Sequence, residues 1–162
     1  MSGLGPITGM IAIPLIGMVL LMLVPDQYVK AIRWLTVLFT TGTLIASLNI
    51  LSLFSQHTFH FQMVEMVPWI PAWNINYKVG IDGISIWLVV LTSLLTLLSV
   101  IFSFYVNKRP KLYFIMLLLF EAAILGVFVS LDMILFYMFF DATLIPMAIM
   151  IYVWGGSNRN YA

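Results

Sequence analysis

The sequence contains no cysteine and few charged residues. Without cysteine, thiol catalysis, disulfide bonds and cysteine-ligated iron–sulfur clusters are all excluded. Only 8% of the 162 residues are charged, and the net charge of +1 offers no basic patch for a nucleic-acid partner. The only histidines, His57 and His60, are followed by Glu65, which is too small a ligand set for a zinc site. No glycine-rich phosphate loop, haem motif or catalytic triad is present, so we expect this chain to bind no metal and no cofactor.

Apolar side chains dominate what remains. Hydrophobic residues make up 63% of the chain and the mean hydropathy is +1.10, values typical of an integral membrane protein. A helix that crosses a bilayer needs about 20 apolar residues. The sequence has five such runs, near residues 7–24, 32–53, 84–106, 112–130 and 133–154. We therefore predict an all-α fold of polytopic transmembrane helices, with residues 1–162 forming one transmembrane domain.

The connections between these runs differ in length. Short polar segments separate the first two spans and the third from the fourth, whereas the only long connection covers residues 54–83. It contains Pro68, Pro71, Trp69 and Trp73, and prolines and aromatic residues of this kind favour a segment that lies at the membrane interface.

The basic residues predict an orientation in the membrane. Six of the seven Lys and Arg fall on one side of it: Lys30, Arg33, Lys108, Arg109, Lys111 and Arg159. Only Lys78 falls on the other side. By the positive-inside rule, the N-terminus is then outside and the C-terminus inside. The first span has no basic segment before it and no small-residue cleavage pattern, so we interpret it as a retained helix.

Two acidic residues interrupt the apolar spans. Asp141 lies in the middle of the fifth span and Glu121 in the fourth, each ten residues from the turn near Leu131. Two antiparallel helices therefore place carboxylates at about the same depth. A carboxylate in the middle of a span costs about 2.5–3.5 kcal/mol on insertion scales, and such groups usually mark a proton or ion path. We predict that Asp141 acts as a proton relay and that Glu121 is a second candidate.

The sequence leaves several interpretations of these acids open. No span has a lysine or arginine near its middle, so the two acids either share a proton or take a counter-ion from another segment or subunit. Alternatively, each is protonated and merely hydrogen-bonded to a neighbouring helix. Pro146 follows Asp141 by five residues and can distort the helix there, or it can simply pack in an ordinary bent helix. Gly80, Asp82 and Gly83 precede the third span, where we predict a structural motif with Asp82 capping the first turn.

Three segments carry a resemblance to a known family. They are Gly80-Ile-Asp-Gly-Ile-Ser85, residues 120–132, and residues 135–147 followed by Trp154-Gly-Gly and Arg159. In this order they resemble subunit M of bacterial NADH-quinone oxidoreductase, which is chain 4 of the mitochondrial enzyme, respiratory complex I. The resemblance extends over essentially the whole chain, and it implies that these residues are the N-terminal part of an antiporter-like subunit. Multi-subunit cation/proton antiporters and membrane-bound hydrogenases are relatives of the same family.

The resemblance implies a role in proton translocation coupled to quinone reduction. In the family a glutamate of the fifth span pairs with a lysine of the seventh, and Asp141 occupies the position of that glutamate. Aspartate is one methylene shorter, which changes the pairing distance. Members of the family are longer than this chain, so we expect the chain alone to be an incomplete pump. The chain could be a truncated open reading frame, one part of a subunit that is split between two genes, or a portion of a longer protein. In each case it would contain only part of the inverted repeats of the family. In such an incomplete chain, Glu121 and Asp141 would face lipid or a separate chain that supplies the remaining helices.

The functional prediction is therefore a translocase subunit of NADH-quinone oxidoreductase. NADH, FMN, iron–sulfur clusters and quinone would belong to other subunits, and the partners would be other membrane subunits of complex I and the lipid bilayer, with no nucleic acid. We expect the bacterial plasma membrane rather than an organellar inner membrane. The alternatives are a non-catalytic membrane scaffold and a subunit of a related cation/proton antiporter.

Overall fold

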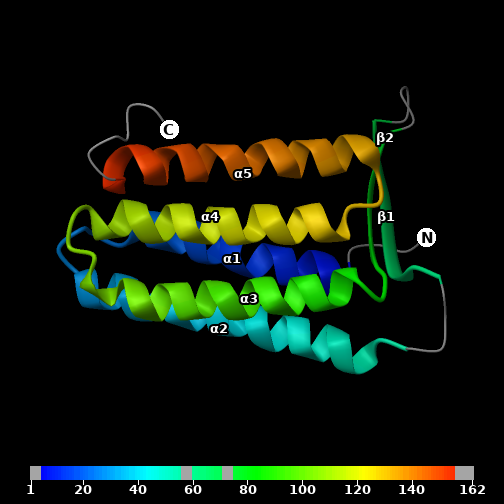
Figure 1. Cartoon of the computed structure of the whole chain (residues 1–162), viewed down its shortest axis with the longest axis horizontal. Coiled ribbons are helices and arrows are strands. Elements are labelled where there is room, and N and C mark those ends of the chain that lie inside the picture. The colour runs from blue at the N-terminus through cyan, green and yellow to red at the C-terminus, as the bar shows by residue number, and fades with distance from the viewer. Residues whose placement is uncertain (1–4, 56–59, 71–74, 156–162) are drawn as a thin grey trace.

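The computed structural model describes residues 5–55, 60–70 and 75–155. Five long helices lie side by side along one axis, and a two-stranded hairpin crosses one end of the bundle (Figure 1). In chain order the elements are α1 (Pro6–Leu23), α2 (Val29–Leu53), β1 (Gln62–Ile70), β2 (Ile75–Ile81), α3 (Ser85–Phe102), the short 3₁₀ helix η2 (Ser103–Tyr105), α4 (Pro110–Val129) and α5 (Met133–Trp154).

Local signals set where several helices begin. Pro6 and Pro110 occupy the first turns of α1 and α4, where the missing proline N–H leaves no hydrogen bond unmade. The Asp132 carboxylate accepts hydrogen bonds from the N–H groups of Ile134 (2.9 Å) and Leu135 (3.3 Å), and so caps α5. Local sequence therefore largely determines where these helices begin.

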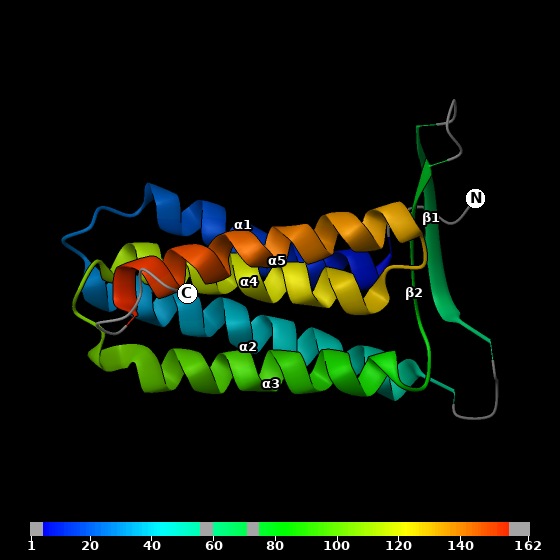
Figure 2. The ribbon, with the colours of Figure 1, turned by 45° about the horizontal axis from the view of Figure 1, so that its top comes forward.

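Helix α4 is the centre of the bundle. It packs against all four other helices, and 56% of its most apolar stretch is buried, against 17% for α5. Figure 2 shows α4 in the middle of the bundle, with α5 and α1 on one side of it and α2 and α3 on the other. Gly126 allows the close approach of α5, because a Cβ there would lie 2.3 Å from the Phe139 ring. Side chains of α4 are thus shielded from the surroundings, whereas those of α5 are mostly exposed.

The hairpin was not predicted from the sequence, although Ile75–Ile81 alternate apolar residues with Asn, Lys and Gly. Strands β1 and β2 pair antiparallel within the long connection that we expected to lie at the membrane interface. The register shifts between Gln62 and Glu65, where Met63 has a positive φ of 52°. This bulge turns the following side chain, Glu65, toward the bundle. The outer edge of β2 is tied to the turn between α4 and α5, because the Leu131 N–H donates to the Lys78 carbonyl at 2.9 Å.

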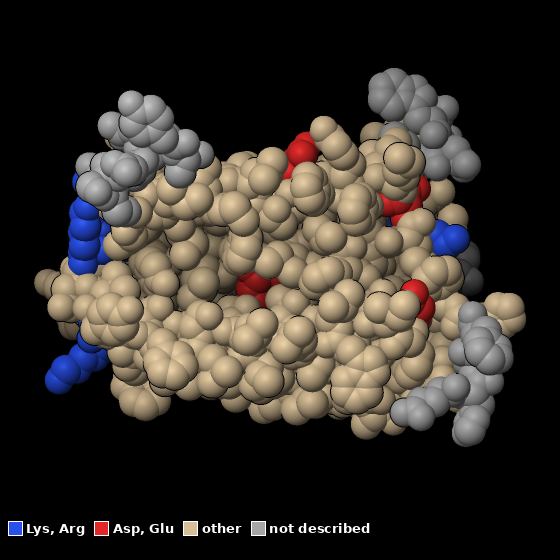
Figure 3. Space-filling model, in the orientation of Figure 1, with Lys and Arg blue, Asp and Glu red and all other residues tan. Residues whose placement is uncertain are grey.

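The predicted helical membrane fold is confirmed. Within the described residues, five helices are long and apolar enough to cross a membrane. The hairpin and the start of α1 lie at one end of the bundle, and α5 ends at the other end (Figure 1). Lys and Arg gather at the end opposite the hairpin (Figure 3). Arg159 lies outside the described residues, and which end faces the cytoplasm remains a prediction.

Candidate functional site

Glu121 is buried at the centre of the bundle and has no hydrogen-bond partner among the described residues. Its side chain has 0% exposure, and neither carboxylate oxygen is hydrogen-bonded to any part of the chain that the structure describes. Buried polar groups in proteins are almost always bonded, and an isolated charge is the most costly exception. Such a group needs a proton, a water molecule or a cation to complete it.

Asp141 occupies a different environment. It lies on an exposed face of α5, surrounded on that helix by exposed apolar side chains such as Tyr137, Phe140 and Leu144. No hydrogen bond or ion pair joins it to another described residue. A carboxylate on a membrane-facing surface is costly unless a neighbouring helix supplies a polar or charged partner.

The two acids share a depth but not a face. Eight residues separate Glu121 from the end of α4, and eight separate Asp141 from the start of α5, so both lie about 12 Å from the turn. However, the expectation that both would face lipid or a partner chain is wrong for Glu121, which the other helices of this chain enclose. A proton shared directly between them is also contradicted, since neither Glu121 oxygen makes a hydrogen bond to Asp141 or to any other residue that the structure describes.

Pro146 lies inside α5 and is buried, and the helix continues through it to Trp154. Because a proline cannot donate, the carbonyl of Ala142, four residues earlier, loses its helical partner. That carbonyl lies one residue from Asp141. Pro14 occupies a similar buried position inside α1, so proline within a span is not particular to the acidic helix.

The motif Gly80, Asp82 and Gly83 forms the entry to α3. The Asp82 carboxylate accepts hydrogen bonds from the N–H groups of Ser85 (2.6 Å) and Ile84 (3.1 Å), and these bonds lower the pKa of Asp82. Gly80 permits close packing, because a Cβ there would lie 2.7 Å from Leu131. Gly83 has open space around it and no positive φ, so its place in the motif has no packing explanation.

Sequence reasoning missed the polar cluster around Glu65. This side chain is only 3% exposed and reaches from β1 to the first turn of α1. Its Oε1 accepts from the Ile7 N–H at 2.7 Å, and its Oε2 accepts from the Thr8 N–H at 3.2 Å and from the Thr8 hydroxyl. The Thr8 hydroxyl is also 2.9 Å from that of Tyr77. A Cβ at Gly5 would lie 2.8 Å from Oε1, so glycine there makes room for the carboxylate.

Glu65 thus caps α1 from 58 residues away. A signal existed in the sequence: residue 5, before the helix, is glycine and offers no capping side chain, so the cap must come from elsewhere. The same cluster affects Tyr77. Burial raises the pKa of Tyr77, the hydrogen bond with Thr8 opposes this, and the nearby Glu65 charge adds to the rise.

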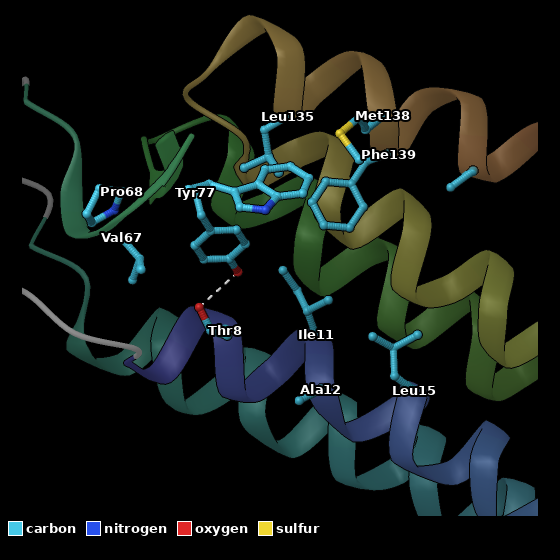
Figure 4. A pocket seen from close by; sticks show the side chains of 12 residues that line it. Thr8, Ile11, Ala12, Leu15, Val67, Pro68, Tyr77, Leu135, Met138 and Phe139 are labelled. Atoms are coloured by element: carbon cyan, nitrogen blue, oxygen red, sulfur yellow. Dashed lines mark hydrogen bonds between the residues drawn. The ribbon is translucent and has the colours of Figure 1, made fainter. Parts of the chain in front are cut away.

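A large apolar cleft lies beside this cluster. Its volume is about 580 Å³, and it is bounded by α1, α5 and the hairpin (Figure 4). Leu135, Met138 and Phe139 of α5 face Ile11 and Leu15 of α1 across it, and the Thr8–Tyr77 hydroxyl pair lies on its hairpin side. No acidic side chain lines this cleft, so Asp141 lies on another side of α5. The cleft therefore offers mainly hydrophobic contact, with the Thr8 and Tyr77 hydroxyls as its polar groups.

Of the histidines, His60 is exposed and His57 lies outside the described residues. Glu65, which follows them in sequence, is fully engaged at the start of α1.

Comparison with known proteins identifies relatives over nearly the whole chain. NADH-ubiquinone oxidoreductase chain 4 of Marchantia polymorpha is 40% identical over 154 residues, which are 94% of this chain and 31% of that protein. NADH-quinone oxidoreductase subunit M of Rickettsia conorii is 42% identical over 158 residues, covering 94% of this chain and 32% of the relative. NAD(P)H-quinone oxidoreductase chain 4-2 of Synechocystis is 34% identical over 161 residues, covering 96% and 28%. No protein-family model matches the sequence.

The fold gives the same result. A chain of respiratory complex I from Thermus thermophilus with bound NADH superimposes with a TM-score of 0.77 and 28% sequence identity, over 94% of this chain and 30% of that chain. The protein therefore spans about a third of the length of the relatives that it matches. On shared sequence and shared fold, the chain belongs to the family of NADH-quinone oxidoreductase subunit M and chain 4.

Proposed function

We propose that this chain takes part in proton translocation within the membrane arm of an NADH-quinone oxidoreductase, with Glu121 and Asp141 as proton-binding groups. The single observation that carries the proposal is the unpartnered carboxyl of Glu121 at the centre of the bundle. A structural acid would have acquired hydrogen bonds, as Glu65 has. An acid without them is free to bind and release a proton when water or a neighbouring charge reaches it.

Asp141 is the second proposed proton-binding group. It lies at the depth of Glu121 but on the outer face of the bundle, where another helix can reach it. A cation from such a helix would favour the ionised carboxylate, and its withdrawal would favour the protonated form. The resemblance of Asp141 to the fifth-span glutamate of the family supports this assignment. The freed carbonyl of Ala142 provides an acceptor for water beside it.

The remainder of the proposal follows from family membership. The partners are other membrane subunits of complex I and the helices that complete the antiporter-like fold. Redox cofactors and quinone belong to other subunits, and proton movement here is coupled to quinone reduction at a distance. The bacterial plasma membrane is the proposed location, with the basic end of the bundle in the cytoplasm.

The test removes titration while keeping shape. In the assembled complex, Glu121→Gln and Asp141→Asn should each lower proton pumping at least about tenfold per NADH oxidised, which corresponds to the loss of one proton-transfer group. Pumping is followed by the quenching of a pH-sensitive dye in vesicles, and assembly by native gel electrophoresis. Asp141→Glu should retain pumping, because it restores the residue that the family carries. Asp132→Asn is the matched control, since it changes another acid to its amide at a helix cap outside the spans.

The outcomes separate the candidates. Normal pumping by both amide variants in a fully assembled complex would exclude these acids from translocation and favour a scaffold. Loss of assembly in both variants would also favour a structural role. Pumping of sodium or potassium in exchange for protons, without NADH or quinone, would instead indicate a cation/proton antiporter.

A further inference from the structure

A second cavity lies at the end of the bundle opposite the hairpin. Its volume is about 410 Å³, and it is formed where the connection between α1 and α2 meets the start of α4. Two basic residues, one acid and apolar side chains of α4 line it together: Asp26, Arg109, Pro110, Lys111, Leu112 and Ile115. We propose that this cavity binds one anionic phospholipid, with the phosphate against Arg109 and Lys111 and the first part of an acyl chain against Leu112 and Ile115.

Arg109 has hydrogen-bonding capacity that no described residue uses. Arg33 donates to the Val106 carbonyl and to the Asn107 side chain, and Lys108 donates to the Val153 carbonyl at 2.8 Å. The Arg109 guanidinium makes no hydrogen bond or ion pair with any described residue, although it lines the cavity. A planar guanidinium offers five donors that suit phosphate oxygens.

Lys111 brings a second positive charge to the same wall. Its ammonium donates to the Met22 carbonyl at 3.0 Å and lies 3.4 Å from the Asp26 carboxylate. That ion pair is weak, because the Asp26 side chain is 84% exposed and solvent screens it. A lipid phosphate can therefore compete with Asp26 for Lys111.

The lower part of the cavity selects a lipid over a free anion. Leu112 and Ile115 are three residues apart on α4, so they lie on one face of a helix that enters the apolar part of the bundle. Ile115 is already buried within the bundle, but Leu112 is only partly buried. A free phosphate would leave the exposed part of Leu112 uncovered, whereas an acyl chain would cover it and gain hydrophobic free energy for each methylene that it buries. The basic residues gathered at this end (Figure 3) match the attraction between juxtamembrane cations and anionic lipid.

The experiment measures lipid binding to the full chain in lipid nanodiscs. Nanodiscs of phosphatidylcholine receive increasing fractions of phosphatidylglycerol, and retained lipid is quantified by native mass spectrometry. Arg109→Gln should weaken the retention of phosphatidylglycerol about fivefold, through the loss of one direct guanidinium–phosphate contact. Lys108→Gln is the matched control: its ammonium is held by the Val153 carbonyl and does not line the cavity, so it contacts no bound phosphate and retention should change less than about twofold.

Two further variants test the proposal independently, in case Arg109→Gln does not fold. Asp26→Asn removes the competing acid at an exposed position and should strengthen retention. Leu112→Asn should weaken the retention of long-chain phosphatidylglycerol but not that of a short-chain analogue. Equal losses from Arg109→Gln and Lys108→Gln would overturn the proposal in favour of diffuse attraction to the bilayer. Displacement of the lipid by millimolar glycerol phosphate or inorganic phosphate would overturn it in favour of a simple anion site.

Discussion

Two buried glutamates of this chain have opposite surroundings. Glu65, on β1, is 3% exposed and accepts hydrogen bonds from the first turn of α1 through both oxygens. Glu121, on α4, is 0% exposed and accepts no hydrogen bond from the described part of the chain. The same residue type therefore serves as a structural cap at one end of the bundle and stands unpartnered at its centre. Partners, rather than burial, distinguish the acid that caps α1 from the acid that we propose as a proton-binding group.

The largest expected effect tests the structural half of this comparison. Glu65→Ala should lower the free energy of unfolding by about 3 kcal/mol, because it leaves the buried N–H groups of Ile7 and Thr8 without acceptors. Thermal unfolding of the purified chain in detergent measures the loss. Asp26→Ala, at an exposed acid, is the control and should have little effect. Equal stability of the Glu65 variant and the wild type would show that the hairpin does not hold α1.

The next effect has the opposite sign. Glu121→Met replaces an unpartnered carboxyl by an apolar side chain of similar length, so the free energy of unfolding should stay the same or rise by about 1 kcal/mol. The same unfolding assay measures it, with Leu118→Ala as a control for a true packing loss in the same buried helix. A marked destabilisation by Glu121→Met would indicate that Glu121 has partners after all, and the contrast with Glu65 would disappear.

The last test concerns Asp82, a third acid, which lies at a helix start and is only half-buried. Asp82→Ala should cost about 1 kcal/mol through loss of the cap of α3. Hydrogen bonds lower the pKa of Asp82 in the folded chain. Its stabilisation is therefore fully present above the unfolded pKa of about 3.9 and disappears as the pH falls through the lower folded value. Unfolding measured between neutral and acidic pH should show this loss in the wild type, and a smaller one in Asp82→Asn.

Much of the fold, and part of the candidate site, could be predicted from local sequence. Runs of apolar residues predicted five helices, and three motifs identified the family, because both depend on residues adjacent in the chain. The common depth of Glu121 and Asp141 also followed, since depth along a helix is set by its rise per residue. The hairpin was not predicted because Pro68 lies inside β1, Pro71 follows directly after it, and β1 lacks strict alternation of apolar and polar residues.

The sequence by itself determined the membrane class, the helical spans and the positions of the acids along them. Only the tertiary structure decided what surrounds each acid. Glu121 is enclosed because α4 packs against every other helix, and Asp141 is exposed because α5 packs chiefly on α4. Glu65 meets Ile7 across 58 residues of chain through a bulged hairpin. Periodicity fixes how far along a helix a side chain lies, whereas the rotation of that helix and the return of distant segments depend on packing of the whole chain.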